Sequence, residues 1–378
     1  MTFGRTAKTA AGLGLAGLMA AALSAGARAA EFDSIINRIK LPPGFHIGVF
    51  AKLPKPRSLA IGKPLGVIFV GSRHGTIHSI RDTNRDGIAD EVLKRAAGLK
   101  VPNGVAIQDS LLYVAMQDHV AQWPVPAEFD MSLPVAPLVP IFKGLPDEFL
   151  HGWRYAKFGP DRKLYVAIGA PCNICMPKGL QGTIIRMDAD GKNQEVFARG
   201  VRNSVGFDWN PITKVLYFTD NGGDGMGDDI PPDELNKADK PGLNFGYPFL
   251  GGKSVKLTGF EDKKAPDGVV GPVVEFQAHT ANLGIKFYTG DMFPAEYKND
   301  AFVAQHGSWN RTEPVGYRIM RIKFDDKGEV AGKEVFAEGW LKDGSAVGRP
   351  VDIAQLADGS LIVSDDFANV IYRIWYEK

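Results

Sequence analysis

One segment of the chain, residues 220–236, has the residue types that a hard metal ion requires. It intersperses carboxylates with the four glycines at positions 222, 223, 225 and 227. Glycine leaves its backbone carbonyl free to turn inward, and carbonyls with carboxylates are the oxygen ligands that Ca²⁺ requires. Arg202 precedes this segment and suggests an anionic ligand beside the cation. A long solvated surface loop is the alternative interpretation of the same stretch.

A second acidic stretch, residues 82–90, also offers oxygen ligands. Acids and an asparagine occupy alternate positions, with a glycine at the sixth, as in a calcium loop. The twelfth position of such a loop is Leu93 rather than a bidentate acid. The stretch therefore predicts either a plain hairpin turn or a structural calcium site. The candidate ligands are Asp82, Asn84, Asp86 and Asp90.

The chain has two cysteines, Cys172 and Cys175, with two residues between them. Attachment of a haem requires histidine after the second cysteine, where Met176 stands, and a zinc site requires two further ligands. The flanking prolines disfavour the helix start that makes such a pair reactive. In an oxidising compartment we expect a local disulfide, with free thiols as the alternative.

A pattern of short strands recurs six times along the chain. Each copy has a short apolar strand, a turn with Asp or Gly, and a second apolar strand such as residues 112–114 or 164–166. The copies begin roughly 50 to 80 residues apart, a spacing typical of propeller blades. The sequence therefore predicts an all-β fold, a six-bladed β-propeller, in which residues 45–50 pair with residues 371–375 to close the ring.

Polar residues stand at the start of the innermost strand of every copy. In a ring these strand starts converge on one central pocket, whereas a local hydrogen bond is the alternative for any single residue. The longest insertions, residues 203–282 and 105–151, are expected to emerge on a propeller face and build a binding site. The strand-start residues are Arg57, Asn103, His151, Arg202 with Asn203, Asn282 and Arg349.

Residues 1–29 have the composition of a cleaved secretory signal peptide. They carry three basic residues and no acid, and their apolar run is too short to span a bilayer. Residues 30–378 then form a single propeller domain with 41 basic against 43 acidic residues, a formal charge of −2. That balance gives no basic footprint for nucleic acid or anionic lipid. We expect an exported protein, periplasmic or secreted, without a membrane span.

Several motifs occur together over the predicted mature chain. They are His151 with Phe158-Gly159-Pro160-Asp161, Gly200-Val201-Arg202-Asn203, Asp233-Glu234-Leu235-Asn236 and Asn244-Phe245-Gly246-Tyr247-Pro248. In this combination the chain resembles the soluble sugar dehydrogenases that depend on pyrroloquinoline quinone (PQQ). It is more similar to their sorbosone and pyranose dehydrogenase branch than to the glucose dehydrogenase branch.

The resemblance implies a six-bladed propeller with PQQ and Ca²⁺ at the mouth of the channel. His151 matches the family's catalytic base, and Asp233 lies where the family has an acid close to the cofactor. Gly222 and Gly223 match the stretch that offers carbonyls to the metal, to which Asp233 is a further candidate ligand. The matching cofactor-contacting positions are Arg202, Asn203, Asn221 and Arg349.

Two departures from the family pattern alter the expected cofactor site. The last copy reads Arg349-Pro350-Val351-Asp352 where the family often has Arg-x-Arg-Asp, so one guanidinium is missing. Residues 306–311 stand where glucose dehydrogenases place a lysine. We expect other cations and rings to replace the missing groups. The candidates are Arg57, Asn103, His306, Trp309 and Arg311.

The predicted reaction is the oxidation of an aldose or aldosulose, with electrons passing to a periplasmic quinone or cytochrome c. A sugar hydroxyl must lose its proton as hydride leaves the same carbon, and a histidine with a pKa of about 6.5 can accept that proton. His151 is therefore the predicted base, with Asp233 as a candidate partner. Two alternatives remain open: a calcium-dependent sugar lactonase, and a non-catalytic propeller that binds a ligand or a protein.

Overall fold

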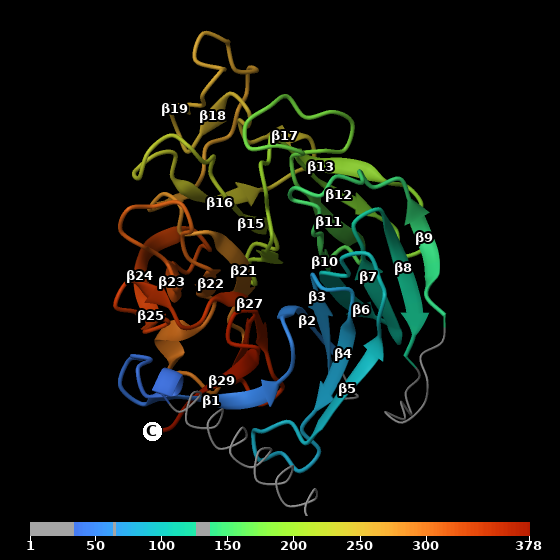
Figure 1. Cartoon of the computed structure of the whole chain (residues 1–378), viewed down its shortest axis with the longest axis vertical. Helices are drawn as coiled ribbons and strands as arrows, with labels where there is room; N and C mark the ends of the chain where they lie inside the picture. Colours follow the sequence, from blue (N-terminus) through green and yellow to red (C-terminus); the bar gives the residue numbers. More distant parts are fainter. Residues whose placement is uncertain (1–33, 63–65, 126–136) are drawn as a thin grey trace, which may run out of the picture.

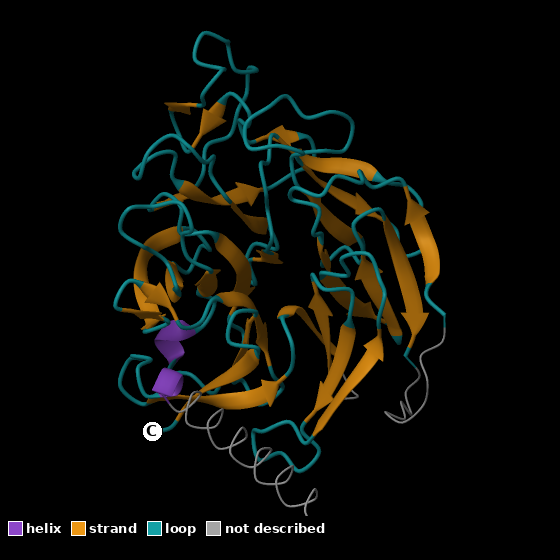
Figure 2. Cartoon of the chain, viewed as in Figure 1, coloured by secondary structure: helices purple, strands orange, loops and turns teal. Residues whose placement is uncertain are grey.

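The computed structural model describes residues 34–62, 66–125 and 137–378. The predicted signal peptide, residues 1–29, lies outside the described residues. Within the described ranges, no helix is long and apolar enough to cross a membrane. Almost all of the regular structure is β-strand, arranged as sheets around a centre (Figure 1 and Figure 2).

Six sheets form the blades of a propeller, as the repeats predict. Each contains four antiparallel strands, and one has a fifth strand that pairs in parallel. The first three blades are β2 (Pro56–Gly62), β3 (Val67–Ser72), β4 (Ile77–Arg81) and β5 (Glu91–Ala96); β6 (Gly104–Gln108), β7 (Leu111–Ala115), β8 (His119–Pro124) and β9 (Val139–Lys143); and β10 (Tyr155–Phe158), β11 (Leu164–Ile168), β12 (Thr183–Met187) and β13 (Glu195–Arg199), extended by β17 (Leu243–Asn244).

The last three blades follow the same order around the ring. They are β14 (Phe207–Trp209), β15 (Leu216–Asp220), β16 (Asp233–Ala238) and β20 (Val274–Phe276); β21 (Asn282–Phe287), β22 (Ala301–Gln305), β23 (Arg318–Phe324) and β24 (Val330–Glu338); and β27 (Pro350–Gln355), β28 (Leu361–Asp365) and β29 (Val370–Tyr376) with β1 (Phe45–Lys52).

The N-terminal strand closes the ring by joining the last blade. β1 runs antiparallel to β29, with Phe45 opposite Tyr376 and Lys52 opposite Val370. This pairing confirms the predicted closure. Because β1 forms backbone hydrogen bonds with β29, that edge of β29 is not exposed. The remaining short elements are β18 (Leu250–Gly251), β19 (Val255–Lys256), β25 (Leu341–Lys342), β26 (Ser345–Ala346) and the 3₁₀ turn η1 (Ala295–Tyr297).

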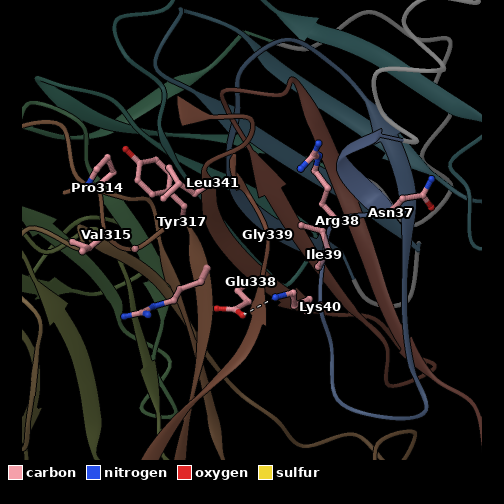
Figure 3. Close-up of a pocket in the computed structure, with 12 residues that line it drawn as sticks. Asn37, Arg38, Ile39, Lys40, Pro314, Val315, Tyr317, Glu338, Gly339 and Leu341 are labelled. Atoms are coloured by element: carbon pink, nitrogen blue, oxygen red, sulfur yellow. Dashed lines mark ion pairs between the residues drawn. The ribbon is translucent and has the colours of Figure 1, made fainter. Parts of the chain in front are cut away.

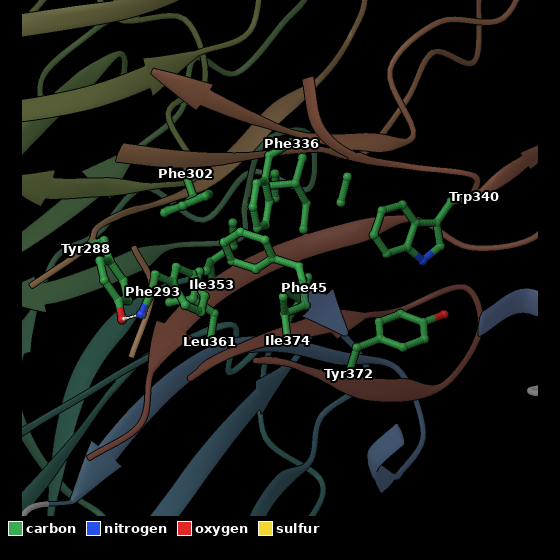
Figure 4. Close-up of a cluster of buried hydrophobic side chains, with 14 of the residues drawn as sticks. Phe45, Tyr288, Phe293, Phe302, Phe336, Trp340, Ile353, Leu361, Tyr372 and Ile374 are labelled. Atoms are coloured by element: carbon green, nitrogen blue, oxygen red, sulfur yellow. Dashed lines mark hydrogen bonds between the residues drawn. The ribbon is translucent and has the colours of Figure 1, made fainter. Parts of the chain in front are cut away.

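The hydrophobic core is divided among the interfaces between neighbouring blades. Phe69 of β3 lies in one buried cluster with Val114 of the second blade, whereas Ile68 and Val70 lie in another with Ile362 of the last blade. Successive side chains of a strand point to opposite faces, so each blade packs on both neighbours. Figure 4 shows the aromatic cluster in which Phe45 packs against residues of the last two blades.

The innermost strands surround the central channel. β2 contacts β6 and β27, and β21 contacts β14 and β27. Inside this ring, the buried Asp208 of β14 pairs with Lys157 of β10 at 2.9 Å and with Lys286 of β21 at 3.0 Å. Burial opposes the charge of Asp208, but the two ammonium groups outweigh it and lower the pKa of the carboxyl to about 2.

Because the native pKa of Asp208 is below its unfolded value of about 3.8, the ion pairs stabilise the fold above that pH. We expect Asp208→Asn to reduce the free energy of unfolding by about 2 kcal/mol at pH 7. The difference from wild type should shrink as the pH falls from 4 toward 2, which thermal unfolding at several pH values measures. Asp326→Asn, at an exposed position, is the control. A difference that is constant with pH would contradict this account.

Candidate active site

A cavity of about 330 Å³ lies at the channel mouth where the innermost strands begin. Five of the six blades contribute to it, through residues near the starts of innermost strands, such as Arg57 and Arg349, and through loops between strands. The tertiary structure thus brings together residues spread over three hundred positions. The predicted site residues that line the cavity are Arg57, His151, Arg202, Asn203, Asn221, Gly222, Asp233, His306, Trp309 and Arg349.

Three of the residues predicted to hold the cofactor and its metal lie outside the cavity lining. Asn103 is buried behind it, where its side chain accepts a hydrogen bond from Arg57 Nε at 3.0 Å. Arg311 turns away and pairs with Asp229 at 3.0 Å. Gly223 packs toward Ile174. The structure therefore gives Asn103 and Arg311 supporting contacts rather than a place on the cavity wall.

The other predicted calcium stretch, residues 82–90, forms a turn between β4 and β5. Asp82 accepts hydrogen bonds from the backbone of Arg85 and Gly87, and Asp90 accepts from Thr83. In the described ranges, no group of three or more His, Cys, Asp or Glu is arranged to hold a metal ion. These hydrogen bonds within the segment are consistent with a plain hairpin turn. A structural calcium ion at Asp82, Asn84, Asp86 and Asp90 stays a prediction.

His151 precedes β10 and is buried at the wall of the cavity. Its backbone is in the left-handed region, with φ of 53°, a conformation that non-glycine residues rarely adopt and that often marks functional sites. Its Nδ1 lies 2.8 Å from the carbonyl oxygen of Ala170, which assigns the ring proton to Nδ1 and leaves Nε2 as a proton acceptor. Burial and the nearby Arg202 lower the pKa of His151 to about 3, so the ring is neutral.

The imidazole of His151 bonds to the carbonyl of Ala170 rather than to Asp233, its predicted partner. Asp233 instead accepts hydrogen bonds from the backbone of Gly222 and Ala281, each at 2.7 Å, and from Thr280 at 3.1 Å. The physical reason is that a buried carboxylate at the start of β16 is surrounded by backbone donors of two neighbouring loops. Asp233 therefore holds the segment around Gly222 in place.

Four guanidinium groups converge on the cavity, and two of them lack a carboxylate partner in the described part of the chain. Arg57 pairs with Asp366 at 2.8 Å and Arg202 with Asp224 at 3.0 Å. Arg349 donates only to backbone carbonyls, and Arg73 lies 3.9 Å from the ring centre of Trp153. The cavity also contains polar and aromatic side chains that the sequence pattern does not predict: Arg73, Trp153, His279 and Asn310 line it, and Asp366 contacts Arg57 and His306 of the lining.

Arg73 and Arg349 bring two positive charges to the cavity without a carboxylate partner among the described residues. Burial and the neighbouring Arg57 lower the pKa of Arg73 to about 10, which reflects the cost of holding several guanidinium groups together out of water. The side-chain oxygen of Asn203 is buried and has no hydrogen-bond partner among the described residues. A ligand with several carboxylates and a donor group would satisfy both features.

His306 faces the same cavity from the end of β22. Its Nε2 lies 2.8 Å from Asp366, whose other oxygen pairs with Arg57. Burial lowers the pKa of His306 to about 4, although Asp366 acts in the opposite direction. The His306, Asp366 and Arg57 side chains thus form one hydrogen-bonded chain along the cavity wall, which fixes the orientation of the imidazole.

The segment from Asn221 to Asp224 also borders the cavity, through Asn221, Gly222 and Asp224. Within the described residues, the carbonyl oxygens of Gly222 and Gly223 accept no hydrogen bond. Free adjacent carbonyls fit a hard cation, as the sequence predicts for these two glycines. Behind them, burial raises the pKa of the cross-strand neighbours Asp220 and Glu234.

A separate and larger hollow, of about 670 Å³, lies between the N-terminal segment and residues 314–318 (Figure 3). Lys40 and Glu338 face each other across its edge at 3.8 Å. None of the residues that we predicted for catalysis or cofactor binding lines this hollow. We therefore assign the chemistry to the channel mouth, where the charged groups and His151 meet.

The fold and the site together define a class of protein: a six-bladed propeller with one basic pocket around a neutral histidine. Residues 232–377 match a family described as TrAA12-like. An uncharacterized protein of Borreliella burgdorferi is 38% identical over 360 residues, which cover 92% of this chain and 93% of that protein. Two solved structures share the fold at lower identity.

The holo form of the pyranose dehydrogenase PQQ domain from Coprinopsis cinerea has a TM-score of 0.74 and 18% identity, covering 89% of this chain and 97% of that one. The calcium structure of the Trichoderma reesei carbohydrate-active enzyme of family AA12 has a TM-score of 0.77 and 18% identity, covering 90% and 97%. The family match over residues 232–377 and the shared fold agree with the resemblance to soluble PQQ-dependent sugar dehydrogenases that the sequence predicts.

Proposed function

We propose that this protein oxidises an aldose or aldosulose with PQQ and Ca²⁺ bound at the channel mouth. The observation that carries the proposal is one cavity holding both a neutral, buried His151 and the unpaired guanidinium groups of Arg73 and Arg349. A flat tricarboxylate matches cations placed around a rim better than a neutral sugar alone would. No observation in the cavity favours the lactonase or the non-catalytic alternative.

The residues of the cavity fit the cofactor and its metal. Arg73 and Arg349 would receive carboxylates without first losing an acidic partner, and the free oxygen of Asn203 would accept a donor group. The carbonyls of Gly222 and Gly223 would coordinate Ca²⁺. When bound, PQQ supplies the hydride acceptor and Ca²⁺ polarises its quinone carbonyl.

The chain's own contribution to the reaction is proton transfer and orientation. With Nδ1 of His151 held by Ala170, Nε2 accepts the proton of the sugar hydroxyl while hydride leaves the same carbon. The resulting imidazolium is destabilised by burial and by Arg202, so it returns its proton readily. We propose that the protein is exported by its N-terminal signal and passes electrons to a periplasmic or extracellular acceptor such as a quinone or cytochrome c.

A close approach of two chain segments fixes His151. A Cβ at Gly169 would lie 2.4 Å from the Cβ of His151, so only glycine fits there. We expect Gly169→Ala to displace the imidazole and lower turnover about tenfold with little change in cofactor affinity. Steady-state kinetics measure this, with Gly332→Ala, where the added Cβ meets no atom within 4 Å, as the control. Unchanged turnover would show that the base is not positioned by this contact.

Reconstitution tests the proposed function. The metal-free apoprotein is titrated with PQQ in the presence and absence of CaCl₂, and binding is followed by the cofactor's absorbance. Dye reduction is then measured across aldoses, aldosuloses and sugar lactones. Sugar-dependent dye reduction that requires both PQQ and Ca²⁺ is the expected result. Lactone hydrolysis without quinone would establish the hydrolase instead, and absence of both binding and turnover would support a binding propeller.

A further inference from the structure

We propose that Asn173, held in the loop that the Cys172–Cys175 disulfide closes, is a positioning residue for Arg202 and for the segment 221–224. Retention of the anionic cofactor and its metal then depends on the redox state of these two cysteines. The inference rests on the proposed function for the identity of the ligand. The contacts that it uses are between residues of this chain.

The first contact set joins the loop to the cavity arginine. Arg202 Nε donates to the backbone oxygen of Asn173 at 2.9 Å, and Nη2 donates to its side-chain oxygen at 2.8 Å. The two bonds grip the guanidinium in a fork and fix its plane. Asn173 of the disulfide loop therefore orients a charged group of the cofactor cavity. Arg202 also pairs with Asp224.

The second contact set joins the same loop to the predicted metal segment. The side-chain amide of Asn173 donates to the carbonyl of Asp224 at 2.7 Å, and its oxygen accepts from the backbone N–H of Asp224 at 2.8 Å. Ile174 packs where a side chain at Gly223 would stand, 3.1 Å from the position of its Cβ. Asn173 is therefore shared between the arginine and the carbonyl-bearing segment.

The disulfide fixes the backbone that presents Asn173. Cys172 and Cys175 are bonded, with their Cα atoms 6.1 Å apart, and the N–H of Cys175 donates to the hydroxyl of Tyr247 at 3.1 Å. That hydroxyl in turn donates to the carbonyl of Asn173 at 3.2 Å. Both cysteines are half-buried, so a small dithiol can reach them. Such a reductant transfers two electrons and two protons, becomes a disulfide itself and leaves two thiols in the loop.

Reduction releases the loop from its covalent closure but leaves the propeller core unchanged. The loop lies outside the strands of the six blades, and its apolar contacts are confined to a small cluster with Ala170, Tyr247 and Leu257. The freed loop samples more conformations, and each must be reordered before Asn173 can orient Arg202. The free-energy cost of this reordering lowers the affinity for the ligand and leaves the free energy of global unfolding unchanged.

Equilibrium binding of PQQ with Ca²⁺ to the apoprotein tests the proposal. Asn173→Ala and the double variant Cys172→Ser with Cys175→Ser should each bind about tenfold more weakly than wild type, because each loses oriented hydrogen bonds to a charged group. Wild type that is reduced with dithiothreitol and freed of it before PQQ is added should bind PQQ more weakly to the same extent, and the double variant treated in the same way should be unchanged. Met176→Ala, at an exposed position directly after this loop, is the control.

A second measurement does not depend on the ligand. Amide hydrogen exchange of peptides that cover residues 202–203 and 221–224 should be faster in reduced than in oxidised apoprotein, with the blade strands unchanged. Unchanged exchange would overturn the inference whether or not PQQ binds. Faster exchange in a protein that binds no PQQ would contradict the proposed function alone. Equal affinity of the reduced, oxidised and Asn173→Ala proteins would overturn the inference and leave the proposed function intact.

Discussion

Replacement of His151 is expected to lower turnover by about 10² to 10⁴-fold while the protein still takes up PQQ and Ca²⁺. The physical reason is that Nε2 is the acceptor left free when Nδ1 donates to the carbonyl of Ala170. Burial and Arg202 lower the pKa of the ring to about 3, so the acceptor is present throughout the neutral range.

Two variants separate the chemical role of His151 from its backbone role. His151→Ala removes the base, but alanine tolerates the local φ of 53° poorly. His151→Asn also removes the base, and asparagine adopts this region with less strain. Both should lose turnover to a similar extent, whereas His46→Ala on β1 should be unaffected. If His151→Asn retains more than about a tenth of wild-type turnover, His151 is not the base.

Replacement of Arg349 by alanine is expected to weaken PQQ binding by at least about 30-fold, the lower end of the effect of removing one member of a buried charged contact. Arg349 is held in the cavity by Nε to the carbonyl of His306 at 3.0 Å and Nη2 to that of Gly307 at 2.6 Å. Because no carboxylate of the described chain pairs with it, its removal leaves no orphaned acid. The loss therefore measures the contact with the ligand.

The measurement is the dissociation constant of PQQ for the apoprotein with Ca²⁺, together with the midpoint of thermal unfolding. Arg349→Lys should restore part of the affinity, because it keeps the charge but lacks the planar fork. Arg162→Ala, which removes a solvent-exposed ion pair with Asp109, should leave binding unchanged. An affinity for PQQ that does not respond to Arg349→Ala would show that this guanidinium does not contact the ligand.

The missing family arginine near Arg349 illustrates how the fold compensates for a local change. The sequence pattern indicates one guanidinium fewer in the last copy, and Arg57 was a candidate replacement. In the structure Arg57 is paired with Asp366, whereas Arg73 reaches the cavity from the end of β3 and lies against Trp153. Arg73 follows the second strand of its blade, so it does not belong to the recurring pattern of polar residues at innermost strand starts.

The order of the blades, the closure by β1 and the convergence of His151, Arg202 and Arg349 were determined by the sequence alone. These features follow from local signals: alternating apolar residues, turn residues and polar strand starts that recur with each copy. The tertiary structure decided which groups are paired. Ala170 rather than Asp233 contacts His151, and Asn173 holds Arg202, because these hydrogen bonds depend on the path of loops between strands, which the strand pattern does not specify.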